Sequence, residues 1–156
     1  MGKFTNRIQA EFNPPRKWVL SRELIYTNPY IDEDALNDVG AEVKGHKVTV
    51  KKGFVTDLAS TPKILWNFIA PWDVARAAII HDLLYKCIRQ YRSEQSQGLL
   101  SSEDPKVVAK AKKAADNVFH MAMKDADPSV PKWKIAAAYY SVKMFGRWSI
   151  VPRKED

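Results

Sequence analysis

The first half of the chain has the alternation of apolar and polar positions that is typical of β-strands. The stretch Lys17–Thr27 is rich in β-branched and aromatic residues, and Ala41–Leu58 alternates between apolar and polar residues. Within the second stretch, Gly45 suits a hairpin turn and Gly53 suits a bend or bulge. The intervening segment Asn28–Asp38 is polar and contains turn residues, which predicts turns there.

The second half has helical periodicity, with apolar residues recurring about every 3.6 positions. Its predicted helices are Trp72 to about Gln95, Asp104 to about Asp125, and Lys132 to Phe145. Asp104 is placed to cap the second helix and Pro105 to fill its first turn. Gly146 is expected to close the third helix.

These elements predict an α+β fold, in which an N-terminal antiparallel β portion precedes a three-helix part with a helical hairpin. We expect a single domain over 1–156, mainly β over 1–62 and mainly α over 63–150, with a tail over 151–156. A chain of 156 residues with 46% hydrophobic and 28% charged residues is long enough, and of the right composition, to bury a core.

The net charge of +7 favours anionic partners such as lipid headgroups or acidic protein surfaces. The basic residues are scattered, with short clusters at Lys51–Lys52 and Lys110–Lys113, so solvated helix faces are expected rather than a nucleic-acid site. The single Cys87 excludes an internal disulfide. There is no apolar run near the roughly 20 residues that span a bilayer, and no apolar leader at the N-terminus. We expect a soluble protein made in a cytoplasm.

The pair His81-Asp82 is the first candidate for chemistry. His81 lies in the apolar stripe of the first long helix, Asp82 lies about 100° further round, and Tyr85 is one turn on from His81. An unpaired buried imidazole costs roughly 1–3 kcal/mol, so His81 requires a partner. The partner is either a backbone carbonyl, in a purely structural role, or a carboxylate in a functional site.

Asp116, on the second long helix, is the candidate carboxylate partner. An antiparallel helix pair would bring it near His81, where it could orient the imidazole and leave the other nitrogen as a general base. His120 is one turn after Asp116 and could support the site. Two alternatives remain open: an exposed pair of Asp116 and His120, or one metal held by His81, Asp82, Asp116 and His120.

The segment Gly53–Pro62 combines a carboxylate, hydroxyls and a proline at the end of a strand. Asp57 and Ser60 could cap a following short helix, which is a structural role. Alternatively, Thr56, Asp57 and Ser60 could point into the site formed by His81. No Gly-x-Ser-x-Gly sequence surrounds Ser60, which argues against a serine nucleophile.

Two spaced motifs, Gly53-Phe54-x-Thr56-Asp57-x-Ala59-Ser60-x-Pro62 and then His81-Asp82-x-Leu84-Tyr85, resemble a family of tailed phages and prophages, domain of unknown function family 1353. The resemblance covers roughly residues 15–90. It implies a phage-encoded protein that is part of the virion or associated with its tail. It implies no established activity.

The helical part also resembles phospholipase A2, in particular the compact form of parvovirus capsids. The resemblance implies that His81 activates water, that Asp82 binds Ca²⁺ and that Asp116 supports the histidine, with Tyr85 as a supporting hydroxyl. The glycine-rich calcium loop of that family is absent before the helix. Residues 53–60 would have to replace the loop, with Asp57 facing the ion.

Three hypotheses follow. The first is a phage structural or tail-associated protein, made in the host cytoplasm and carried in the virion with other virion proteins, in which Asp57, His81 and Asp82 form a hydrogen-bonded cluster in the core. The second is a Ca²⁺-assisted phospholipid ester hydrolase that acts at an anionic membrane surface during infection. The third is a metal-dependent phosphohydrolase that uses His81, Asp82 and His120 and needs one further ligand.

Overall fold

The structure is a computed structural model that describes residues 2–5, 7–13, 17–57, 71–96, 104–126 and 129–153. The strands are β1 (Lys3–Phe4), β2 (Ala10–Asn13), β3 (Lys17–Leu20), β4 (Leu24–Thr27), β5 (Lys47–Val50) and β6 (Val55–Thr56). The helices are α1 (Glu33–Asn37), α2 (Pro71–Ser96), α3 (Pro105–Lys124) and α4 (Lys132–Ser149). The order of elements confirms the predicted α+β fold, with the strands first and the long helices after them.

The strands form two small antiparallel sheets, with the orders β1-β4-β5 and β2-β3-β6. In the first sheet, Leu24 pairs with Val50 and Tyr26 pairs with Val48. These four side chains are buried, because alternate residues of a strand point to one face and that face is turned to the core. The predicted turn at Gly45 is present: Gly45 and His46 both have positive φ, between the bridged residues Lys44 and Lys47.

The segment Asn28–Asp38, predicted to form turns, contains the short helix α1. The Asp32 side chain accepts a hydrogen bond from the Ala35 backbone N–H at 3.1 Å, which caps the helix. Ala35 and Leu36 are buried, so tertiary packing stabilises a helix too short to persist alone. Helix α1 itself contains only two apolar residues, which is too weak a periodic signal to predict a helix.

The long helices agree with the prediction at their starts and differ at one end. Asp104 caps α3, and its side chain accepts from the Lys106 backbone N–H at 2.8 Å. The predicted stop at Gly146 is wrong, because α4 continues through this residue to Ser149. Gly146 is buried, and a Cβ there would overlap the Tyr85 hydroxyl of α2. This glycine therefore permits a close helix contact instead of ending a helix.

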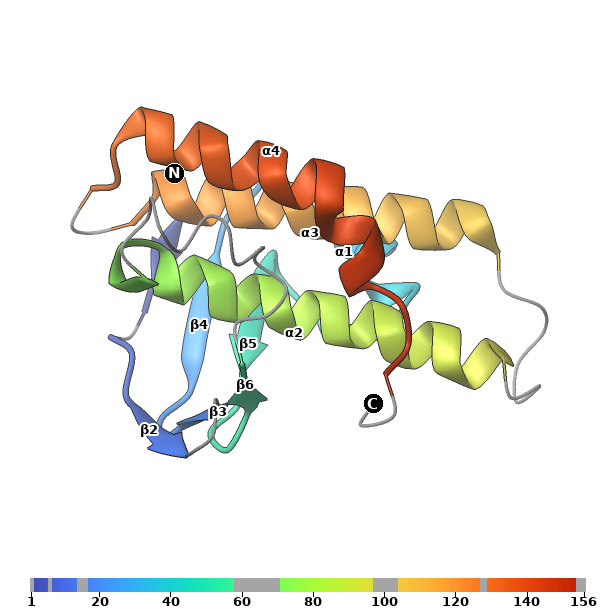
Figure 1. The fold of residues 1–156 in the computed structure, drawn as a ribbon, viewed down its shortest axis with the longest axis horizontal. Helices are drawn as coiled ribbons and strands as arrows, with labels where there is room; N and C mark the ends of the chain where they lie inside the picture. Colours follow the sequence, from blue (N-terminus) through green and yellow to red (C-terminus); the bar gives the residue numbers. More distant parts are fainter. Residues whose placement is uncertain are drawn as a thin grey trace.

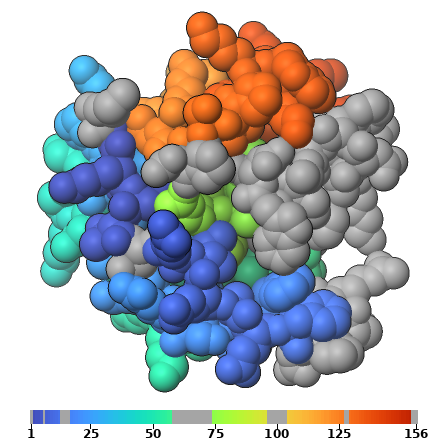
Figure 2. All heavy atoms as spheres, turned by 90° about the vertical axis from the view of Figure 1, so that its left-hand side faces the viewer, coloured from blue at the N-terminus to red at the C-terminus, as the bar shows by residue number. Residues whose placement is uncertain are grey.

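The helices are layered against the sheets. Helix α2 crosses the middle of the molecule, α3 runs antiparallel to it, and α4 lies over α3, with β2, β3 and β6 on the opposite side of α2 (Figure 1). In the view of Figure 2, orange residues of the α3–α4 layer form the top and blue N-terminal residues the bottom. One cluster of buried apolar residues joins the β4–β5 sheet to all three long helices. None of the described helices has the length and apolar character needed to cross a bilayer.

Candidate functional site

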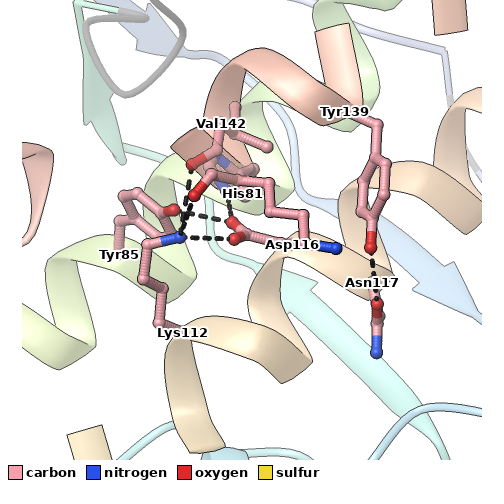
Figure 3. A network of polar contacts seen from close by, with 8 residues as sticks. His81, Tyr85, Lys112, Asp116, Asn117, Tyr139 and Val142 are labelled. Carbon is pink, nitrogen blue, oxygen red and sulfur yellow. Dashed lines mark hydrogen bonds and ion pairs between the residues drawn. The ribbon is translucent and has the colours of Figure 1, made fainter. Parts of the chain in front are cut away.

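The antiparallel pair α2–α3 brings His81 and Asp116 into contact, as predicted. The Nε2 atom of His81 lies 2.9 Å from the Oδ1 atom of Asp116, and the two side chains are 0% and 5% exposed (Figure 3). The rings of Tyr85 and Phe119 pack against the imidazole, with centroids 4.0 Å and 4.8 Å away. The orientation of His81 is therefore set by packing on its faces and by a carboxylate at one nitrogen.

The Asp116 carboxylate accepts from two further side chains. The Tyr85 hydroxyl donates to Oδ1 at 2.6 Å, and the Lys112 ammonium donates to Oδ2 at 2.7 Å (Figure 3). Burial opposes the charge of Asp116, but the bonds from His81, Lys112 and Tyr85 outweigh it, so its pKa lies below the usual range. Burial and the neighbouring Asp116 charge raise the pKa of Tyr85, which keeps its hydroxyl a donor. The cluster thus holds an ionised carboxylate against the histidine.

Helix α4 completes this cluster through its backbone. Lys112 also donates to the carbonyl oxygens of Val142 at 3.2 Å and Lys143 at 3.4 Å. Gly146, one turn further along α4, leaves the space that the Tyr85 hydroxyl occupies. The roles of Lys112 and Gly146 in this cluster were not predicted from the sequence. The spacing of four between Lys112 and Asp116 could have indicated the ion pair, whereas nothing in the local sequence indicates that Gly146 faces Tyr85.

Asp82 belongs to a second buried pair, which joins α2 to the strand β6. The Thr56 hydroxyl donates to Asp82 Oδ2 at 2.5 Å, while the buried Oδ1 atom has no hydrogen-bond partner. Burial raises the pKa of Asp82, against the opposing effect of the Thr56 bond, and the charge of Asp57 raises it further. Asp57 itself lies 3.8 Å from Arg153, measured between Oδ2 and Nη1.

The other predicted residues lie elsewhere. His120 stacks on Tyr139 of α4 with ring centroids 4.4 Å apart, and burial lowers its pKa. Ser60 lies outside the described residues. Within the part of the chain that the structure describes, no group of three or more His, Cys, Asp or Glu side chains is arranged to hold a metal ion. The set of His81, Asp82, Asp116 and His120 is therefore not assembled as one ligand group.

Asp82 and Asp57 are the residues predicted to bind Ca²⁺, and the Thr56 hydroxyl donates to Asp82. Asp82 contributes an unpaired buried oxygen, Asp57 is a nearby carboxylate and Thr56 contributes a hydroxyl. Ca²⁺ takes six to eight oxygen ligands, and Arg153 competes for Asp57. The described side chains alone therefore do not make a calcium shell.

The fold and the site define an α+β protein with a buried His–Asp pair held between two antiparallel helices. A family model described as a protein of unknown function, DUF1353, matches residues 36–142, which is more than half of the chain, so the chain belongs to this family. The matched region contains both His81 and Asp116. It begins later and ends later than the range of roughly residues 15–90 over which the resemblance was predicted. No curated protein and no solved structure matches the chain.

Proposed function

We propose that this protein hydrolyses carboxylic esters of phospholipids, with His81 as the general base. The 2.9 Å contact between His81 and Asp116 across antiparallel helices supports this proposal most directly. The roles that the phospholipase A2 resemblance implies need this arrangement, with Tyr85 donating to the same carboxylate. Replacing a buried ionic cluster by apolar residues is often neutral or stabilising, so a packed core does not require these polar groups.

In the proposed reaction, Asp116 accepts a hydrogen bond from the Nε2–H of His81. This bond favours the tautomer in which Nδ1 is the basic nitrogen. Nδ1 takes a proton from water as the water oxygen bonds to the ester carbonyl carbon, and Asp116 stabilises the imidazolium that forms. The carbon–oxygen bond to the alcohol then breaks, and His81 returns the proton to the leaving oxygen.

The test measures release of fatty acid from labelled phospholipid vesicles, once with Ca²⁺ and once with EDTA, because Asp82 and Asp57 are proposed to face the ion. His81→Gln is expected to lower the rate about 10²- to 10⁴-fold, the usual contribution of a general base. His46→Gln is the matched control, since His46 lies in the β-turn and contacts the Ile31 carbonyl. A folded wild-type protein that releases no fatty acid under either condition contradicts the proposal.

The second candidate function is that of a phage structural or tail-associated protein, as the family resemblance implies. The observation that favours it is that His81 is 0% exposed and that the Asp116 oxygens are fully engaged by three side chains. The cluster then serves to hold α2, α3 and α4 together. Such a protein is made in the host cytoplasm and carried in the virion beside other virion proteins.

Quantitative mass spectrometry of density-purified particles tests this second function. The chain is expected at a constant copy number per particle, and His81→Ala is expected to destabilise the purified protein by about 3–5 kcal/mol, because it leaves Asp116 without its buried partner. Absence of the chain from particles would argue against a virion role. Unchanged stability of His81→Ala would argue against a structural role for the cluster.

A further inference from the structure

The outward face of α4 is covered by large apolar side chains. Those exposed along the helix are Trp133, Tyr140, Met144, Phe145 and Trp148. Met144 is 63% exposed and Trp148 is 57% exposed, although α4 buries its opposite side through Ile135, Ala138 and Val142. Spacings of seven, four and four residues from Trp133 through Tyr140 and Met144 to Trp148 keep these side chains on one side of the helix. Within the described part of the chain, these five side chains of α4 remain exposed.

Basic side chains accompany this face. Helices α3 and α4 together carry nine lysines and arginines and one acidic residue, the buried Asp116. This excess is larger than the net charge of +7 of the whole chain. The Arg147 guanidinium lies 4.4 Å from the centre of the Trp148 ring, and the Lys134 ammonium lies 5.8 Å from that of Trp133. Basic side chains therefore flank the aromatic ones directly.

We propose that the outer face of α4 docks the protein on an anionic lipid bilayer, with the helix lying in the plane of the interface. Helices that bind this way have tryptophan and other large apolar residues on one face and lysine or arginine beside them. Tryptophan and tyrosine also favour the headgroup level. The charge of α4 complements anionic lipids, each basic residue near such a surface contributing to attraction.

The same face fits two other partners less well. A second copy of the chain would place the basic residues of two α4 helices against one another, which charge repulsion opposes. A nucleic acid is bound mainly by basic side chains on its phosphates, whereas here large apolar side chains make up the face and basic ones lie beside them. The bilayer is the partner that matches both features.

The inner side of α4 contacts the His81–Asp116 cluster. The Val142 and Lys143 carbonyls accept from Lys112, and Gly146 accommodates the Tyr85 hydroxyl. A single helix thus separates the proposed bilayer from the cluster. Docking does not depend on the hydrolase proposal, because it concerns the opposite side of α4.

Co-sedimentation with vesicles tests docking. One set of vesicles contains ether-linked phosphatidylglycerol mixed with ether-linked phosphatidylcholine, and the other contains ether-linked phosphatidylcholine alone. Ether lipids contain no carboxylic ester, so binding is measured whether or not the protein hydrolyses esters. The wild type is expected to bind the vesicles that contain phosphatidylglycerol at least tenfold more tightly than those of phosphatidylcholine alone. The double variant Met144→Ser/Trp148→Ser should lose at least tenfold in binding. Lys143→Gln/Arg147→Gln should lose about tenfold and depend less on salt.

Matched variants outside the α3–α4 layer provide the controls. Tyr30→Ser removes another exposed aromatic residue, and Lys51→Gln/Lys52→Gln removes two other exposed charges. Circular dichroism verifies that every variant folds, and the controls are expected to bind like the wild type. The proposal is overturned if the wild type does not prefer anionic vesicles or if the α4 variants bind them normally. It is also overturned if the α4 variants instead dissolve a dimer or abolish binding to single-stranded DNA while vesicle binding is absent.

Discussion

Asp116 is the residue on which the candidate site depends. It accepts from three donors that come from α2 and α3, and its own charge keeps Tyr85 protonated and holds Lys112 in place. A carboxylate with this set of partners is stabilised as an ion despite its burial. The proposed hydrolase and the proposed structural role both require an ionised Asp116. The pH dependence of its contribution to stability therefore bears on both proposals.

Asp116→Asn is expected to lower the free energy of unfolding by about 3 kcal/mol at pH 7, since it leaves the Lys112 ammonium without its buried counter-charge and His81 without its carboxylate acceptor. The folded-state pKa of Asp116 is lowered, so its stabilising contribution is present above the unfolded-state value of about 3.9. That contribution is lost as the pH falls through the folded-state pKa. The difference in the free energy of unfolding between the wild type and Asp116→Asn should therefore be smaller at pH 3 than at pH 7, as measured by urea unfolding.

The exposed Asp38→Asn is the control for this substitution, and it should change stability by less than about 0.5 kcal/mol at both pH values. If Asp116→Asn lowers the free energy of unfolding by the same amount at pH 7 and pH 3, the result contradicts an ionised, stabilising Asp116.

At the scale of elements, the contact between α2 and α4 depends on one small residue. Gly146 lies within a helix, where glycine normally costs about 1 kcal/mol relative to alanine. It lies at a place where any Cβ would overlap the Tyr85 hydroxyl. The same close approach lets the Val142 and Lys143 carbonyls reach Lys112. The position of α4 and the geometry of the cluster are therefore linked.

Gly146→Ala is expected to destabilise the protein by about 1–3 kcal/mol through overpacking, although alanine favours the helix. Combined with Tyr85→Phe, which removes the overlapping oxygen, it should cost less than the sum of the single changes by about 0.5–3 kcal/mol. Urea unfolding of the four proteins in this double-mutant cycle measures the coupling. Tyr139→Phe replaces Tyr85→Phe in the control cycle and should be additive. If the effects are additive in both cycles, Gly146 does not couple the position of α4 to Tyr85, and the prediction is contradicted.

At the scale of the whole molecule, the β portion and the helices share one hydrophobic core. Leu24 and Val50 of the first sheet belong to the same buried cluster as Ile80 of α2 and Val118 of α3. The His81–Asp116 cluster and the Thr56–Asp82 bond both lie where α2 meets its neighbours. A core shared in this way favours cooperative unfolding of both parts together.

Differential scanning calorimetry is expected to record one unfolding transition, with equal calorimetric and van't Hoff enthalpies, because the sheet and helices cannot lose their shared core independently. Two resolved transitions would instead divide the chain into separate units and contradict the prediction of a single domain.

The sequence by itself determined the class of the fold, its three long helices and one contact of the candidate site. Helical periodicity placed α2, α3 and α4, and the Asp104-Pro105 pair marked the start of α3. The apolar pattern marked the stretches that contain β3, β4, β5 and β6, but not β1 and β2. The antiparallel order of two adjacent helices was enough to pair His81 with Asp116. These features are local or come from neighbouring elements, so a linear pattern encodes them directly.

Only the tertiary structure decided which distant groups meet. It joined Thr56 to Asp82, brought the α4 backbone to Lys112, and used Gly146 as a contact instead of a helix end. It also packed α3 and α4, which together carry nine lysines and arginines, against each other. Such contacts depend on how helices rotate and approach one another in the packed core, which periodicity along a single segment does not specify.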